Sequence, residues 1–209
     1  MFEKPRAWVR QPSGCRLDLI NPDPNGWKDE DLSIGLSRTY RWGGHSIWDR
    51  PMSVAQHSIL VLVLRERLSG KLSRAEALRE LLHDAEEGLI GFDPISPLKF
   101  VLGDAFIQLL ERLTAAVFER YNLPNWCSED KRLHKLADHL AAACEAVHIA
   151  GWKPLEVKQT LGIAMEPIHD DPLVSIYGGK PWEPWPNEVA AERFLIMLNN
   201  LTYPLREAA

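Results

Sequence analysis

The segment from Ser53 to Gly70, SVAQHSILVLVLRERLSG, constrains the fold more than any other stretch of the chain. Ser53 and Gln56 have the spacing of a helix capping box, which predicts a helix that begins near Val54. The middle of this helix is apolar on all sides, and such a helix is stable in water only when other elements surround it. The sequence therefore predicts a buried central helix inside a larger helical domain.

Further helical patterns fill the rest of the chain, and no segment shows the sustained alternation of a strand. Capping residues and apolar spacing predict helices at about 29–40, from Ser73 to Gly88 or Gly91, and at about 99–121, 129–150, 154–162 and 187–201. Residues 92–98 are predicted to be a proline-broken loop, and residues 163–186 are predicted to be irregular. We therefore expect an all-α protein.

The length of 209 residues suits a single domain of moderate size, and no convincing linker divides the chain. Residues 1–28 are proline-rich and are expected to be irregular, with a small hairpin around residues 12–14. Residues 29–151 should form the core of the domain. Residues 152–209 should add C-terminal helices and a segment rich in Pro and Trp that packs on this core.

Charge and composition argue against several classes of protein. The formal net charge of −5 does not suit wrapping of nucleic acid, which needs a basic surface. The longest aliphatic run, residues 59–64, is too short to span a bilayer, and the N-terminal residues lack the apolar region of a signal peptide. The three cysteines, Cys15, Cys127 and Cys144, form no C-x-x-C pair. We expect a cytoplasmic protein without nucleic-acid or membrane partners.

Histidines and acids gather at particular points of this apolar pattern. His57 lies in the first turn of the central helix, and His83 and Asp84 lie near the end of the next one. Asp138 lies in helix 129–150, and the neighbours on its face are Ala141, Ala142 and Glu145. Two imidazoles and two carboxylates suit one divalent transition metal, such as Co, Mn, Fe, Ni or Zn. Taken singly, each residue is more often structural, and the stretch LLHDAEE can also be an acidic helix end.

The order H…HD…D on three predicted helices resembles the HD-domain phosphohydrolase superfamily. The matching residues are His57 in VAQHS, His83 and Asp84 in LLHDAEE, and Asp138 in KLADHL. Within this superfamily the chain is most similar to the bacterial 5′-deoxynucleotidase group and related phage deoxynucleotide phosphohydrolases. That likeness covers roughly residues 30–150 and includes Arg41-Trp42, Glu87 and the loop GFDPISPLK, in which Phe92 is an extra residue before Asp93.

The resemblance implies an HD-domain helical bundle, a homodimer and a metal-dependent enzyme. The expected reaction is hydrolysis of (deoxy)nucleoside 5′-monophosphates to nucleoside and phosphate. Metal ligation is expected from His57, His83, Asp84 and Asp138, catalysis from Glu87 and Asp93, and substrate binding from Arg41, Trp42 and Lys99. Glu87 would hold the attacking water and exchange a proton, and Trp42 would crowd the 2′ position of the sugar. Lys99 can also be a solvated lysine, and Trp42 a core residue.

Alternative interpretations stay open beside this one. His134 is the only histidine between Asp84 and Asp138, and we interpret it as a surface residue, so a single-metal centre is expected. His45, His139, His148 and His169 are assigned no role. The same core would suit a deoxynucleoside triphosphate triphosphohydrolase, which releases triphosphate. From another class, a helical module that binds a nucleotide or a partner without catalysis has the same sequence features.

Overall fold

Helix α2 (Val54–Ser69) is buried over most of its length among other helices, as its apolar sequence predicts. The Ser53 hydroxyl accepts a hydrogen bond from the backbone N–H of Gln56 and so begins the helix where the capping pattern places it. The side chains of Ile59, Leu60 and Val61 are fully buried. The computed structural model describes residues 6–203, and all statements on structure refer to these.

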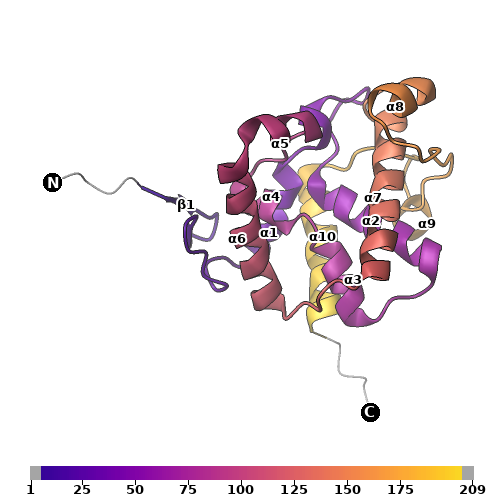
Figure 1. The fold of residues 1–209 in the computed structure, drawn as a ribbon. Coiled ribbons are helices and arrows are strands. Elements are labelled where there is room, and N and C mark those ends of the chain that lie inside the picture. Colours follow the sequence, from indigo (N-terminus) through magenta and orange to yellow (C-terminus); the bar gives the residue numbers. More distant parts are fainter. Residues whose placement is uncertain (1–5, 204–209) are drawn as a thin grey trace, which may run out of the picture.

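Helices make up most of the chain, and a small hairpin stands at one side (Figure 1). Strands β1 (Trp8–Arg10) and β2 (Arg16–Asp18) pair antiparallel, with Val9 opposite Leu17. The other helices are α1 (Asp29–Arg38), α3 (Arg74–Leu81), α4 (Ala85–Ile90), α5 (Ser96–Leu102), α6 (Asp104–Tyr121), α7 (Ser128–His148), α8 (Pro154–Thr160), α9 (Val174–Tyr177) and α10 (Asn187–Thr202), with a 3-10 turn η1 (Arg41–Gly44). The predicted all-α class and the N-terminal hairpin are confirmed.

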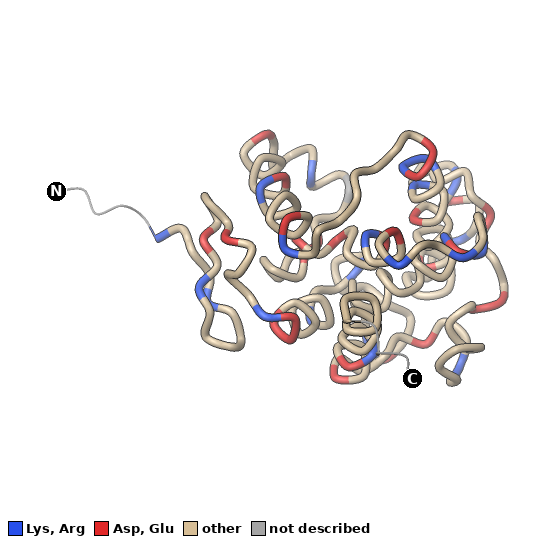
Figure 2. Tube along the Cα trace, turned by 90° about the horizontal axis from the view of Figure 1, so that it is seen from below, with Lys and Arg blue, Asp and Glu red and all other residues tan. Residues whose placement is uncertain are grey.

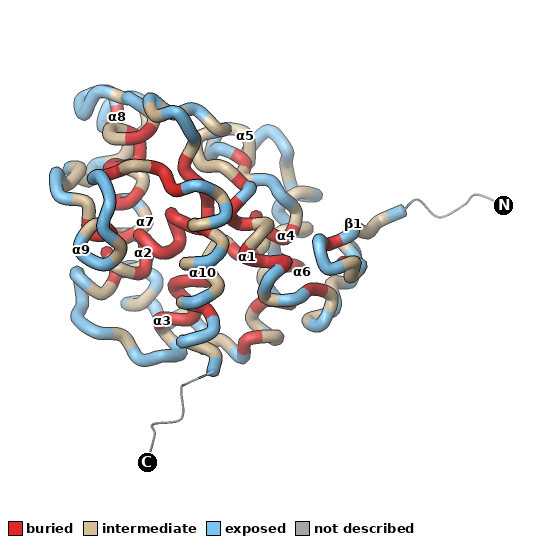
Figure 3. The backbone as a smooth tube through the Cα atoms, turned by 180° about the vertical axis from the view of Figure 1, so that it is seen from behind, coloured by how far each residue is buried: buried red, intermediate tan, exposed pale blue. Residues whose placement is uncertain are grey.

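The helices surround α2 on several sides. Helices α7, α3, α1 and α10 all pack against it, and α1 also packs on α10 and α4. Figure 3 shows the buried segments gathered in the middle of the bundle, whereas α5, α9 and the hairpin are largely exposed. Figure 2 shows acidic and basic residues interspersed along the chain. Among residues 6–203, no helix is both long enough and apolar enough to cross a membrane.

Two helices that the sequence predicts as continuous are broken in the structure. The helix expected from Ser73 to Gly88 or Gly91 ends at Leu81, and α4 begins after a turn at residues 82–84. The helix expected at 99–121 is interrupted at Gly103, whose φ of 71° is outside the helical region, and α5 already begins inside the predicted loop. His83 and Asp84 therefore lie in a turn between two helices, not near the end of one.

A close approach of two glycines fixes the position of α4. A Cβ atom built on Gly35 of α1 would overlap the backbone carbonyl of Gly88 in α4, and a Cβ on Gly88 would overlap the Leu36 side chain. The turn at residues 82–84 lets α4 leave the direction of α3 and reach this crossing with α1. The same crossing holds Glu87, the residue before Gly88, in the interior of the molecule.

Gly35→Ala is expected to destabilise the protein, although alanine is the better helix former by about 1 kcal/mol. The added methyl group must push α4 away, and overpacking of this kind costs roughly 1–3 kcal/mol. Chemical denaturation followed by circular dichroism measures the free energy of unfolding. A variant more stable than wild type would show that α1 and α4 do not approach as closely as described.

Candidate metal centre

Four side chains from three parts of the chain converge on one point. His57 comes from the first turn of α2, His83 and Asp84 from the turn between α3 and α4, and Asp138 from the middle of α7. The Nε2 atom of His57 lies 3.3 Å from His83 Nε2, 3.4 Å from Asp138 Oδ1 and 3.5 Å from Asp84 Oδ2. His83 Nε2 lies 3.2 Å from Asp84 Oδ2. The structure thus brings together the four residues of the H…HD…D pattern.

The spacing of these atoms fits a shared cation. Ligand atoms held about 2.1 Å from one ion are about 3.0 Å apart in an octahedral set and about 3.4 Å apart in a tetrahedral one. One ligand atom each from His57, His83 and Asp138 lies within 4.8 Å of the others, and Asp84 approaches both imidazoles. Imidazole and carboxylate donors together suit a divalent transition metal. The donor set and its spacing therefore fit the ion that the sequence implies.

Hydrogen bonds orient both imidazoles toward this point. His57 Nδ1 lies 2.5 Å from Glu145 Oε1, and His83 Nδ1 lies 2.8 Å from the backbone carbonyl oxygen of Glu80. Both partners are acceptors, so both Nδ1 atoms carry the proton in the neutral rings. The two Nε2 lone pairs then face each other, an arrangement that either a metal ion or a proton between them stabilises. Such outer hydrogen bonds are typical of metal-binding histidines.

The electrostatics of the cluster favour positive charge. Burial and Arg41 lower the pKa of His57, but Glu145 and Asp138 outweigh them and raise this pKa to about 10. Burial would raise the pKa of Asp84, yet the neighbouring His83 holds it well below its usual range. Without another cation, protons supply the positive charge, so metal binding should release protons and weaken as the pH falls.

Glu145 is the residue whose role the sequence did not show. Its side chain is fully buried in α7, two turns beyond Asp138. Besides contacting His57 through Oε1, it accepts hydrogen bonds at Oε2 from Arg41 Nε at 3.2 Å and from Trp42 Nε1 at 3.1 Å. In the sequence, the one indication of a role for Glu145 was its position on the same helix face as Asp138. Glu145 holds the His57 ring and is itself held by Arg41 and Trp42.

Arg41 and Trp42 therefore lie behind His57. Arg41 also donates from Nη1 to Asp93 Oδ2 at 3.0 Å, and both side chains are largely buried. Trp42 has φ 58° and ψ 28°, the left-handed region that a bulky residue rarely adopts. The hydrogen bond to Glu145 and packing against the apolar cluster of α7 and α8 hold it there. The Arg41–Asp93 pair brings two of the predicted site residues into direct contact.

Glu87 lies near the centre in a strained electrostatic environment. Its side chain is 1% exposed, its Oε1 accepts from Lys99 Nζ at 3.2 Å, and its buried Oε2 has no hydrogen-bond partner among the described residues. Burial, and then Asp84 and Asp93, raise the pKa of this carboxyl well above its usual range. The neighbouring Glu86 is not simply solvated either, because burial and Asp84 raise its pKa to about 7.

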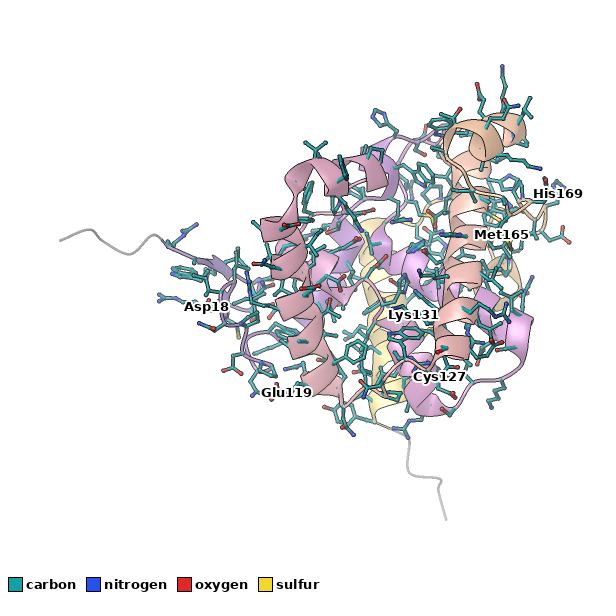
Figure 4. All side chains as sticks on the ribbon, in the orientation of Figure 1. Asp18, Glu119, Cys127, Lys131, Met165 and His169 are labelled. Atoms are coloured by element: carbon teal, nitrogen blue, oxygen red, sulfur yellow. The ribbon has the colours of Figure 1, made fainter. Side chains whose placement is uncertain are left out.

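His134 is not the surface residue that the sequence favoured. Its ring lies 4.9 Å from the His83 ring, and its Nδ1 lies 2.7 Å from Glu80 Oε2. The Glu80 side chain is fully buried, and its Oε1 also forms an ion pair with Arg65 Nε at 3.3 Å. Glu80 therefore contacts both histidines: its carboxylate binds His134, and its backbone carbonyl oxygen binds His83. Cys127 caps the start of α7 through its thiol, at the end of that helix shown in Figure 4.

The fold and the centre define a helical protein with a candidate metal site made of two histidines and two aspartates. No family model matches the chain. The chain is 41% identical over 158 residues to an uncharacterized protein of Rhodobacter capsulatus, an alignment that covers 75% of this chain and 80% of that protein. The chain belongs to the same family as this Rhodobacter protein.

Glu145→Gln is expected to weaken metal binding about 10- to 100-fold, the usual effect of losing an outer partner of a metal-binding histidine. Glutamine keeps the shape but loses the charge that orients and polarises the His57 ring. Competition with a chromogenic chelator measures the metal Kd. The exposed Glu166→Gln is the matched control. Equal affinities for both variants would show that Glu145 does not act through His57.

Proposed function

We propose that this chain is a metal-dependent phosphohydrolase of the HD-domain type. Its substrates would be (deoxy)nucleoside 5′-monophosphates, and its products nucleoside and phosphate. The observation that carries the proposal is the convergence of His57, His83, Asp84 and Asp138 with both Nε2 atoms directed to one point. These residues follow the order of the resemblance and come from separate helices and a turn, as a shared ion requires.

A groove beside α6 supports a small-molecule substrate. It has a volume of ≈ 570 Å³, within the range of sites for small organic ligands. Its lining is mostly apolar and includes Phe106, Leu110 and Phe118, whose side chains suit a base or sugar. Lys99 lines one part of the groove, and its ammonium group contacts Glu87. A ligand in the groove would therefore be able to place a phosphate near the carboxylates of the centre.

The chemistry divides among the residues of the site. A divalent ion, when bound by the four ligands, supplies positive charge to a phosphoryl oxygen and lowers the pKa of water. Arg41 engages Nε and Nη1 within the protein, which leaves Nη2 for a phosphate oxygen, and Lys99 adds a second charge. Glu87 takes up a proton from the attacking water at Oε2 and returns it to the leaving nucleoside oxygen.

Arg41 and Lys99, the two cations beside these carboxylates, suit a monophosphate better than a triphosphate, because the larger charge of a triphosphate would need more cationic partners.

The homodimer that the resemblance implies stays a prediction. Exposed apolar side chains on α5, namely Phe100, Val101 and Leu102, are available for a second copy to cover.

A panel of nucleotides incubated with metal-loaded protein tests the function. Orthophosphate released from deoxynucleoside monophosphates, and lost on chelation, is the expected result. Release of triphosphate from deoxynucleoside triphosphates would favour the triphosphohydrolase instead. Binding of nucleotide without any product would point to a non-catalytic module and overturn the enzymatic proposal.

A further inference from the structure

A second hollow lies apart from the residues of the metal centre. It has a volume of ≈ 370 Å³ and is formed mainly by residues 177–186, YGGKPWEPWP, together with Arg50 before α2 and the start of α10. None of the nine site residues predicted from the sequence lines it. No function was predicted for this stretch, which leads from α9 into α10.

Three cations from separate segments face this hollow: Arg50, Lys180 and Arg193. Within residues 6–203 none of them forms an ion pair, whereas Arg41, Arg65 and Arg79 each do. Glu183 is the one acid in the lining and lies beyond ion-pair distance of all three. Like charges gathered without a partner repel one another, and an anion between them removes that repulsion.

Arg193 is held in position by aromatic rings. Its guanidinium carbon lies 4.2 Å from the centroid of the Trp185 ring and 4.6 Å from that of Tyr177. These stacking contacts use the flat faces of the guanidinium group. Nη2 donates one hydrogen bond to the Tyr177 carbonyl oxygen at 3.4 Å, and the remaining N–H groups are directed sideways, where an acceptor can reach them. An arginine fixed in this way loses little conformational entropy when it binds a planar or tetrahedral oxyanion.

One side of the hollow has an accessible backbone, and hydrogen bonds hold the backbone of another side in place. Gly178 and Gly179 have φ of 69° and 96°, and no atom lies within 4 Å of a Cβ built on either, so a ligand can approach their backbone. On the other side, Gln56 holds the wall: its Oε1 accepts from Trp185 N at 2.8 Å, and its Nε2 donates to Glu183 O at 3.2 Å. The site is therefore formed before a ligand arrives, which favours affinity.

We propose that this hollow is a second binding site, for a small phosphate-bearing anion. Arg50, Lys180 and Arg193 would hold the phosphate, and the prolines and Val189 of the lining would contact an organic group. The volume suits a molecule of mononucleotide size as well as free phosphate. The inference does not depend on hydrolysis at the metal centre, because it rests on a different set of residues.

Calorimetric titration of metal-free protein tests the proposal with three probes: orthophosphate, 2′-deoxyadenosine 5′-monophosphate and 2′-deoxyadenosine. The two phosphate-bearing probes should bind, and the nucleoside should not. Arg50→Gln and Arg193→Gln should each weaken binding about tenfold or more, the usual effect of losing a charge-assisted hydrogen bond. Arg50 is exposed, so its variant remains informative if Arg193→Gln fails to fold.

Two variants separate this site from other effects. Arg67→Gln makes the same charge change at an exposed position outside the hollow and should bind like wild type. Lys99→Gln removes a charge from the proposed substrate groove by α6, so any binding that this variant loses belongs to that groove and not to the hollow. Equal binding of orthophosphate and the nucleotide would support the site with free phosphate as its ligand. Absence of binding, or binding unchanged in Arg50→Gln and in a folded Arg193→Gln, would overturn the proposal.

Discussion

His83→Ala is expected to lose both the bound ion and phosphohydrolase activity while the protein stays helical. His83 supplies one of two imidazole donors, and its Nε2 lies 3.2 Å from Asp84 Oδ2 and 3.3 Å from His57 Nε2, so alanine leaves this position of the cluster without a ligand atom. The wild-type protein should hold about one divalent ion per chain, and the variant close to none. Elemental analysis after dialysis, phosphate release and circular dichroism measure the three quantities.

His139→Ala is the matched control for this experiment. His139 is exposed on α7 beside Asp138, so the same substitution removes an imidazole near the centre but not from it. A ligand that binds only the folded state raises the melting temperature. Metal should therefore stabilise wild type and His139→Ala against heat, and His83→Ala much less. Full metal occupancy in His83→Ala would refute the ligand assignment.

Much of the fold could be predicted from local signals. The apolar run of α2 identifies the buried central helix, and the capping residues at Ser53 and Ser73 place two helix starts correctly. The candidate ligand residues follow from the order of histidines and aspartates on these elements. Their convergence could be expected because a central helix must contact the helices that cover it, and α3 and α7 both do.

The turn at residues 82–84 could not be predicted, because it depends on tertiary packing. No glycine or proline lies between Ser73 and Glu87, so local propensity favours one continuous helix. The break instead satisfies two distant contacts at once. It keeps His83 against α2 and α7, and it turns α4 so that Gly88 meets Gly35 of α1.

The role of Glu145 was hidden for a related reason. A buried glutamate in an alanine-rich helix face shows that a partner exists but not which one it is. The partners are Arg41 and Trp42 of η1, and no local sequence pattern predicts the left-handed backbone of Trp42. Arg41 was expected to face a phosphate, and the structure shows two of its nitrogens engaged with Glu145 and Asp93.

Glu87→Gln is expected to lose about 10²-fold or more in turnover, the usual size of a general acid–base contribution, while it keeps the ion. Glutamine preserves the oxygen that accepts from Lys99 but cannot take up a proton at the position of Oε2. The folded state raises the pKa of Glu87, so its ionised form destabilises the protein above that pKa. The variant should therefore be at least as stable as wild type at alkaline pH.

The expected direction of the stability change distinguishes a loss of catalysis from a loss of folding. A variant that is inactive, fully metallated and no less stable has lost a proton-transfer group, not its structure. Glu119→Gln, at an exposed position near the lower end of α6 (Figure 4), is the neutral control and should behave like wild type. Glu86→Gln is the sharper comparison, because the pKa of Glu86 is also raised, to about 7, and its buried Oε2 also has no hydrogen-bond partner within residues 6–203. Only Glu87 contacts Lys99, which lines the groove by α6. If Glu86→Gln were the inactive variant and Glu87→Gln turned over normally, the proton would pass through Glu86, and the role assigned to Glu87 would be wrong.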